Sequence, residues 1–125
     1  MARPDIVNVT SILSKNAFYS NVPTTEVNVL SNPQSSNKVF KINSIIAANR
    51  DGTNDATVDV SIKKSTGTTT YWYVGKQLEV PADTSLVITS KETSFYLEEY
   101  KAIYALASAA SDISLMISYD EIDDA

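Results

Sequence analysis

The stretch that decides the fold is Ala56-Thr57-Val58-Asp59-Val60-Ser61-Ile62-Lys63, in which apolar and polar residues alternate. In a strand, Val58, Val60 and Ile62 would point to one side and the polar residues to the other. A strand with one apolar and one polar face belongs to an antiparallel sheet with one side in water. Residues 65–68 contain only Ser, Thr and Gly, and residues 69–74 alternate again. The two runs therefore predict a hairpin.

The same two-residue period recurs on both sides of this hairpin. It predicts further strands over residues 25–30, 39–48, 78–80, 85–89, 95–97, 102–107 and 113–119. Short strands at such regular spacing are typical of a sandwich or a barrel. Residues 39–48 are apolar on both faces near their end, which indicates a central strand. Phe40, Ile42 and Ile46 should share one face of it, with Ile45 opposite.

The first 24 residues have a looser pattern. Residues 6–13 resemble a strand, but residues 16–19 and the turn at residues 21–23 do not extend it cleanly. We therefore divide the chain into residues 1–24, an N-terminal arm or edge strand, and residues 25–125, a β-sandwich domain. Whether the first segment packs on a neighbouring molecule or closes its own sandwich stays open at this point.

The predicted fold is all-β: an antiparallel β-sandwich, jelly-roll or immunoglobulin-like, of eight or nine short strands. The length of 125 residues suits one domain, and 43% hydrophobic residues indicate a globular chain. The absence of cysteine and histidine excludes disulfides, thiol nucleophiles, Ser-His-Asp triads and Cys/His zinc sites. We expect no enzyme activity and no cofactor.

The charge is acidic, with 15 Asp and Glu residues against 10 Lys and Arg residues and a net charge of −5. Phosphate backbones repel such a domain, so we expect no nucleic-acid partner. No segment approaches the ~20 apolar residues of a membrane span, and residues 1–5 lack the apolar region of a signal peptide. We therefore expect no membrane partner and folding in a cytosol.

Four acidic residues crowd the C-terminus: Asp120, Glu121, Asp123 and Asp124. They are interpreted as a solvated tail, with an electrostatic contact to a basic partner as the alternative.

Two other acidic groups are candidates for chemical sites. Residues 51–55 are oxygen-rich but lack the spacing of an EF-hand, which favours a turn. Adjacent Glu98 and Glu99 point apart in a strand or turn, so they predict a solvated turn, not a glycosidase pair.

The aromatic run Tyr71-Trp72-Tyr73 is the strongest surface candidate. In a strand, Trp72 takes one face and both tyrosines take the other. Such side chains suit a protein interface or a sugar-binding platform, while packing inside the two-sheet core is the structural alternative. The complete set of interface candidates joins this run to the N-terminal segment: Ile6, Val7, Val9, Ile12, Tyr71, Trp72 and Tyr73.

Several stretches resemble a known group of proteins. They are residues 1–10, 47–53, 78–88, 95–99, 105–110 and 115–122, the last of which reads Leu115-Met116-Ile117-Ser118-Tyr119-Asp120-Glu121-Ile122. Together they are similar to small virion structural proteins of tailed bacteriophages, especially those of marine and cyanobacterial hosts. One departure is Tyr100-Lys101, where that group tends to have a Gly-Asp turn.

The resemblance implies a non-enzymatic component of a phage particle, made in the host cytoplasm and located in the virion. We expect a capsid decoration or cement protein that binds the outer capsid shell. Its implied partners are the major capsid protein or other virion proteins, together with further copies of itself, for example in a trimer. A neck or tail adaptor and a module that binds host glycans are the alternatives.

Overall fold

A computed structural model describes residues 11–64 and 70–123 of the chain. The described residues form nine strands and one short 3-10 turn. These elements are β1 (Ser11–Tyr19), β2 (Val27–Asn32), β3 (Lys38–Asn49), β4 (Ala56–Lys64), β5 (Thr70–Val80), β6 (Ser85–Thr89), η2 (Lys91–Thr93), β7 (Phe95–Leu97), β8 (Lys101–Ala107) and β9 (Ile113–Asp123). The prediction of an all-β chain is confirmed.

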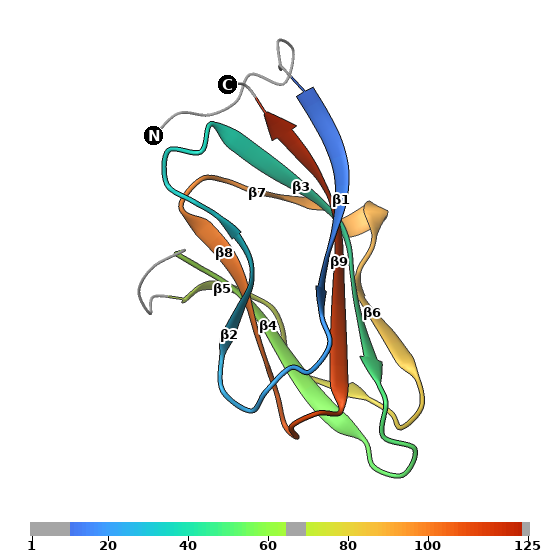
Figure 1. Cartoon of the computed structure of the whole chain (residues 1–125). Coiled ribbons are helices and arrows are strands. Elements are labelled where there is room, and N and C mark those ends of the chain that lie inside the picture. The colour runs from blue at the N-terminus through green and yellow to red at the C-terminus, as the bar shows by residue number, and fades with distance from the viewer. Residues whose placement is uncertain (1–10, 65–69, 124–125) are drawn as a thin grey trace.

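The strands form two antiparallel sheets that pack face to face (Figure 1). The first sheet has the order β1-β9-β3-β6, with β7 also paired to β3, and the second has the order β2-β8-β4-β5. The central position predicted for β3 is therefore confirmed. Contacts of β1 with β2 and of β5 with β6 join the sheets at their two lateral edges.

The connectivity decides between the two predicted sandwich types. The antiparallel pairs β4–β5, β3–β6, β2–β8 and β1–β9 are nested around the β4–β5 hairpin, so the chain is one long hairpin rolled up on itself. Wrapping then brings β9 beside β3 and β8 beside β4. This arrangement of two interlocked Greek keys is the jelly roll, and the immunoglobulin alternative does not apply.

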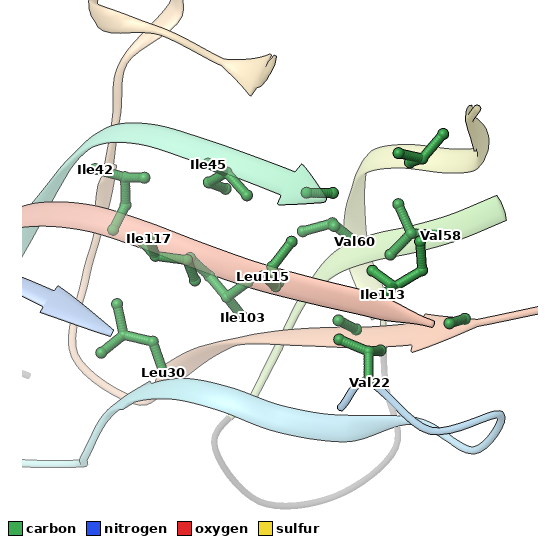
Figure 2. Packing of buried hydrophobic residues seen from close by; sticks show 14 of the residues in the cluster. Val22, Leu30, Ile42, Ile45, Val58, Val60, Ile103, Ile113, Leu115 and Ile117 are labelled. Carbon is green, nitrogen blue, oxygen red and sulfur yellow. The ribbon is translucent and has the colours of Figure 1, made fainter. Parts of the chain in front are cut away.

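The core fills the space between the two sheets. Ile42 and Ile45 of β3, with Leu115 and Ile117 of β9, point from the first sheet toward the second (Figure 2). The second sheet contributes Val58, Val60 and Ile103, among others. Burial of each such aliphatic side chain stabilises the fold by about 1.5–3 kcal/mol. The alternation predicted for β9 is confirmed, because Ile113, Leu115 and Ile117 are all fully buried.

A bulge in β3 overturns one predicted face. The register against β9 shifts between Ile42 and Ser44, so one extra residue reverses the orientation of all later side chains. Ile45 and Ala47 consequently join Phe40 and Ile42 in the core. Ile46, which was expected on the same face as Phe40 and Ile42, lies on the outer face of the sheet instead.

The predicted β4–β5 hairpin is confirmed, but β5 is longer than expected. The runs over residues 69–74 and 78–80, predicted as separate strands, belong to one strand that pairs with β4 through three register shifts. Gln77 has a positive φ of 52° within it. The Gln77 amide donates a hydrogen bond of 2.6 Å to an Asp59 carboxylate oxygen, which holds this irregular segment against β4.

The N-terminal segment contains an edge strand whose bounds differ from the predicted ones. Residues 16–19 belong to β1, which pairs with β9 from Ser11 opposite Asp123 to Tyr19 opposite Leu115 without any register shift. Among the described residues, β1 is the outermost strand of the first sheet. Residues 6–10 of the strand predicted over residues 6–13 lie outside the described residues.

Candidate interaction surfaces

A groove of about 510 Å³ opens at the lateral edge where β5 meets β6 and β7. Its lining residues are Ile62, Trp72, Val74, Ile88, Thr89, Thr93, Phe95 and Tyr96. Ile62, Val74, Ile88 and Phe95 are partly buried and pack against the core. The floor of the groove is therefore a continuation of the core that the two sheets leave open.

Two aromatic side chains stand at the rim of this groove. Trp72 is 69% exposed and Tyr96 is 50% exposed. Trp72 lies directly opposite Ile62 in the β4–β5 pair. Its side chain is therefore on the face of β5 that is directed toward the core, but it is exposed there. The expectation that core packing alone explains the aromatic run is therefore wrong for Trp72.

The polar groups described in the lining of the groove are two threonine hydroxyls. The Thr89 hydroxyl donates to the Thr93 carbonyl at 3.0 Å, and the two threonine hydroxyls also contact one another. Among the side chains that the structure describes, the groove lining includes no carboxylate and no amine. Apolar walls with a few hydroxyl groups suit a planar or aliphatic group from a partner.

The other members of the aromatic run lie elsewhere. Tyr73 faces away from the groove and is 41% exposed, with the Lys76 ammonium 5.2 Å from its ring centroid. Tyr71 is described only as part of the backbone of β5. Trp72 and Tyr73 therefore belong to two different faces, as their alternation predicted.

The structure does not bring the N-terminal candidates to the aromatic run. Ile12 is 56% exposed on β1, at the lateral edge opposite β5. Ile6, Val7 and Val9 lie outside the described residues. Among the described residues, the interface candidates thus lie apart, with Ile12 at one lateral edge and Trp72 and Tyr73 on the two faces of β5 at the other.

A third apolar surface was missed by the sequence reasoning. Phe18, Met116, Ile46 and Val87 occupy directly opposite positions on β1, β9, β3 and β6, and form a row across the outer face of the first sheet. Phe18 is 72% exposed and Val87 is 57% exposed. The signal was hidden because the β3 bulge moves Ile46 to this face and the pairing of distant strands assembles the row.

The described acidic residues near the C-terminus, Asp120, Glu121 and Asp123, belong to strand β9 and not to a free tail. Glu121 is 7% exposed, and its carboxylate lies 2.8 Å from the Lys15 ammonium and 3.3 Å from that of Lys38. Burial raises the pKa of Glu121, but hydrogen bonds from Lys15 and Lys38 outweigh this effect and hold the pKa below its usual value. The Glu121 hydrogen bond raises the pKa of Lys15.

Asp120 accepts a hydrogen bond from the Ser14 hydroxyl at 2.9 Å, also within the sheet. The predicted solvated tail is therefore wrong for the described acids, and Asp124 lies outside the described residues. These contacts fasten β1 to β9.

The other two acidic groups have different outcomes. The turn at residues 51–55 is confirmed, because an Asp51 carboxylate oxygen accepts the Thr53 and Asn54 amides at 2.8 and 3.2 Å. These bonds lower the pKa of Asp51. The predicted solvated turn is wrong for Glu99, which is 1% exposed and has no hydrogen-bond partner for either carboxylate oxygen among the described residues.

Within residues 11–64 and 70–123, no cluster of three acidic side chains has the geometry of a metal site. No helix in this part of the chain has the length and apolar character needed to cross a membrane.

Comparison with known proteins identifies the fold. No family model and no curated protein matches the sequence. The structure is similar to a protein of Bacillus endospore appendages, described as a novel family of disulfide-linked pili, with a TM-score of 0.55 and 14% identity over 92% of this chain and 90% of that one. At this identity the likeness shows the fold alone. The disulfide linkage has no counterpart here, because this chain has no cysteine.

Two phage proteins are more distantly similar. One belongs to the acid-stable capsid of a Helicobacter pylori bacteriophage, with a TM-score of 0.49 and 12% identity over 94% of this chain and 91% of that one. The other is a pentameric capsid protein from metagenomic phage sequences, with a TM-score of 0.34 and 12% identity over 86% of this chain and 60% of that one.

Proposed function

We propose that this chain is a non-enzymatic structural protein of a phage particle, of the marine or cyanobacterial type, that decorates or cements the outer capsid shell. The assignment to a phage particle is supported by the sequence resemblance. The observation that carries the binding role is the groove with the exposed Trp72 at its rim and with Ile62, Val74, Ile88 and Phe95 packed against the core at its floor. A rigid domain that keeps such a groove open in water is suited to receive a side chain or strand of another protein.

The proposed occupant of the groove is a segment of the major capsid protein. Trp72 and Tyr96 supply large, stiff contact areas, and aromatic residues commonly dominate the binding energy of an interface. The N-terminal candidates Ile6, Val7, Val9 and Ile12 would make a second contact, with another virion protein or with a further copy of this chain. Many copies on a shell allow each contact to be modest, because avidity multiplies them.

Binding to empty capsids that lack the protein tests this proposal. Trp72→Ser should weaken capsid binding by at least tenfold, about 1.4 kcal/mol or more, because truncation of a central aromatic anchor typically costs this much or more. Glu79→Ser, which truncates another exposed side chain of β5 outside the groove lining, is the matched control and should leave binding unchanged. Equal binding by wild type and Trp72→Ser would contradict the proposed use of the groove.

The neck or tail adaptor stays an alternative, and imaging of labelled copies separates it from decoration. Labels over the whole shell support decoration, whereas labels at a single vertex support the adaptor.

A host-glycan module is the second candidate, and one observation favours it. Trp72, Tyr96 and the Thr89 and Thr93 hydroxyls share the groove, which is the combination of ring faces and hydroxyl groups that a sugar requires. A glycan array with wild type and Trp72→Ser tests it. Tryptophan-dependent binding to a sugar, without capsid binding, would replace the decoration proposal.

A further inference from the structure

The edges of the two sheets differ in how they are protected against pairing with another strand. Exposed edges normally carry bulges, prolines or charges, or are very short. β6 and β7 have five and three residues, β2 has a bulge between Asn28 and Leu30, and β5 has three register shifts. β1 has nine residues, no proline and no register shift. No described strand pairs with its outer edge.

The side chains of β1 are unusually apolar for a strand in this position. Ile12, Leu13 and Phe18 are 56%, 50% and 72% exposed. The single charged residue of the strand is Lys15, whose ammonium lies 2.8 Å from the Glu121 carboxylate and so is balanced within its own molecule. β1 therefore lacks the free charge that would repel an approaching strand.

The sequence of β1 is symmetric in character about its central residue. It reads Ser11-Ile12-Leu13-Ser14-Lys15-Asn16-Ala17-Phe18-Tyr19. On either side of Lys15 come a small polar residue, then two apolar residues. In an antiparallel pair of two such strands centred on Lys15, Ile12 would stand opposite Phe18 of the partner subunit, and Leu13 opposite Ala17 of the partner subunit. A two-fold interface requires this kind of self-complementarity.

We infer that β1 pairs antiparallel with β1 of a second copy about a two-fold axis at Lys15. The first sheets of the two molecules then form one continuous sheet. Residues directly opposite in an antiparallel pair point to the same face, so Ile12 and Phe18 of the partner subunit both lie on the outer face. Each apolar row that ends at Phe18 is thereby extended by Ile12 of the partner subunit.

Charge and size both fit this occupant. Each Lys15 near the axis is already paired with Glu121 of its own molecule. The contact therefore brings no unpaired charge into the interface between two chains that each have a net charge of −5. The contact is about 30 Å long and about 10 Å thick, from the rise of nine strand residues and the spacing of two sheets. This is at the low end of specific interfaces, so the dimer should be weak in dilute solution and favoured on a crowded particle.

This inference rests on the proposed role in a particle, for which the sequence resemblance implies self-association, but not on capsid binding. It predicts a dimer, whereas the sequence resemblance suggested a trimer. A monomer that still binds capsids would overturn the β1 pairing and leave decoration intact. A β1 dimer that does not bind capsids would overturn the decoration proposal and leave the β1 pairing intact.

Two oppositely charged variants test the register. Ile12→Lys with Phe18→Lys, and Ile12→Glu with Phe18→Glu, each place like charges opposite one another in the homodimer. Because both sites are exposed, the monomers should fold as wild type does, as circular dichroism and thermal melting would verify. Sedimentation velocity at concentrations of about 100 μM should show dimers of the wild type. The dissociation constant of the dimer should be at least tenfold higher for each variant. An equimolar mixture of the variants should restore dimers.

The matched control carries the same charges at the opposite edge. Val87 and Tyr96 are similarly exposed, and their Lys and Glu double variants should dimerise as wild type does, alone and mixed. A monomeric wild type would overturn the inference. So would charged β1 variants that dimerise normally, or a mixture of them that stays monomeric.

Discussion

Glu99 lies in the turn between β7 and β8, where 1% of its surface is exposed and neither carboxylate oxygen has a hydrogen-bond partner among the described residues. A buried polar group without a partner costs about 1–3 kcal/mol. Glu99→Met keeps a similar volume and removes this cost, so it should raise the free energy of unfolding by about that amount. Urea unfolding at neutral pH measures the change.

Glu98→Met is the control, because Glu98 is only half-buried and its carboxylate lies 3.5 Å from the Lys101 ammonium. It should change stability little. Lower stability of Glu99→Met than of wild type would show that the carboxylate contributes a favourable contact and contradict this reading.

Glu121 makes stability depend on pH in a defined direction. Its pKa in the folded state is held below the usual value by Lys15 and Lys38, so its contribution is present above the unfolded-state pKa and is lost as the pH falls through the folded-state pKa. The pKa of Lys15 is raised, so its contribution is present below 10.5 and lost at higher pH. β1 should therefore be held most firmly between about pH 5 and pH 10.

Glu121→Gln isolates this effect. The variant should be less stable than wild type by about 1–3 kcal/mol at pH 7, because two charge-assisted hydrogen bonds are lost. The difference should shrink as the pH falls through the lowered pKa of the folded-state Glu121 carboxyl, because the wild-type side chain then becomes protonated too. Urea unfolding at several pH values measures it, with Asp120→Asn as control. A difference that does not vary with pH would contradict the assignment.

At the scale of single elements, local pattern predicted well wherever a strand is regular. β4 and β9 alternate over most of their length, and both were predicted within a few residues of their bounds. The bulge in β3 and the shifts in β5 were not predicted, because an extra residue in a strand is decided by the partner strand and leaves no local signature. The bounds of β1 were not predicted, because its exposed apolar side chains do not follow the pattern of a half-buried strand.

The groove shows the same limit at the level of the site. Trp72 was correctly singled out as a surface candidate, but Ile88, Phe95 and Tyr96 come from strands that meet β5 only after the sandwich closes. Their spacing in the sequence carries no sign of this meeting. The residues of such a site are predictable one by one, whereas their assembly depends on non-local pairing.

At the scale of the whole molecule, the nested pairing predicts an order of folding. Lys63 faces Thr70 in the innermost pair, whereas Ser11 faces Asp123 in the outermost pair. The loop closed by the outer pair is longer by about four doublings, each of which costs about 0.6 kcal/mol. We therefore expect folding in milliseconds to seconds, with β4–β5 contacts formed early and β1–β9 contacts late.

Folding and unfolding kinetics of two variants test this order. Val58→Ala in β4 should slow folding, with a φ-value above about 0.5, whereas Ala17→Gly in β1 should mainly speed unfolding, with a φ-value below about 0.3. The reverse ranking would show that the sheet edges nucleate folding.

The opposition of Ser11 and Asp123 also has a mechanical consequence. The first described residue of β1 and the last of β9 lie side by side at one end of the sandwich (Figure 1). A force that pulls these two ends apart would act perpendicular to the strands, in the direction of the hydrogen bonds between β1 and β9. It would therefore break these hydrogen bonds one after another and not all at once. The molecule would yield to a small tension at its ends. A load carried through the faces of the sheets would meet the whole core at once.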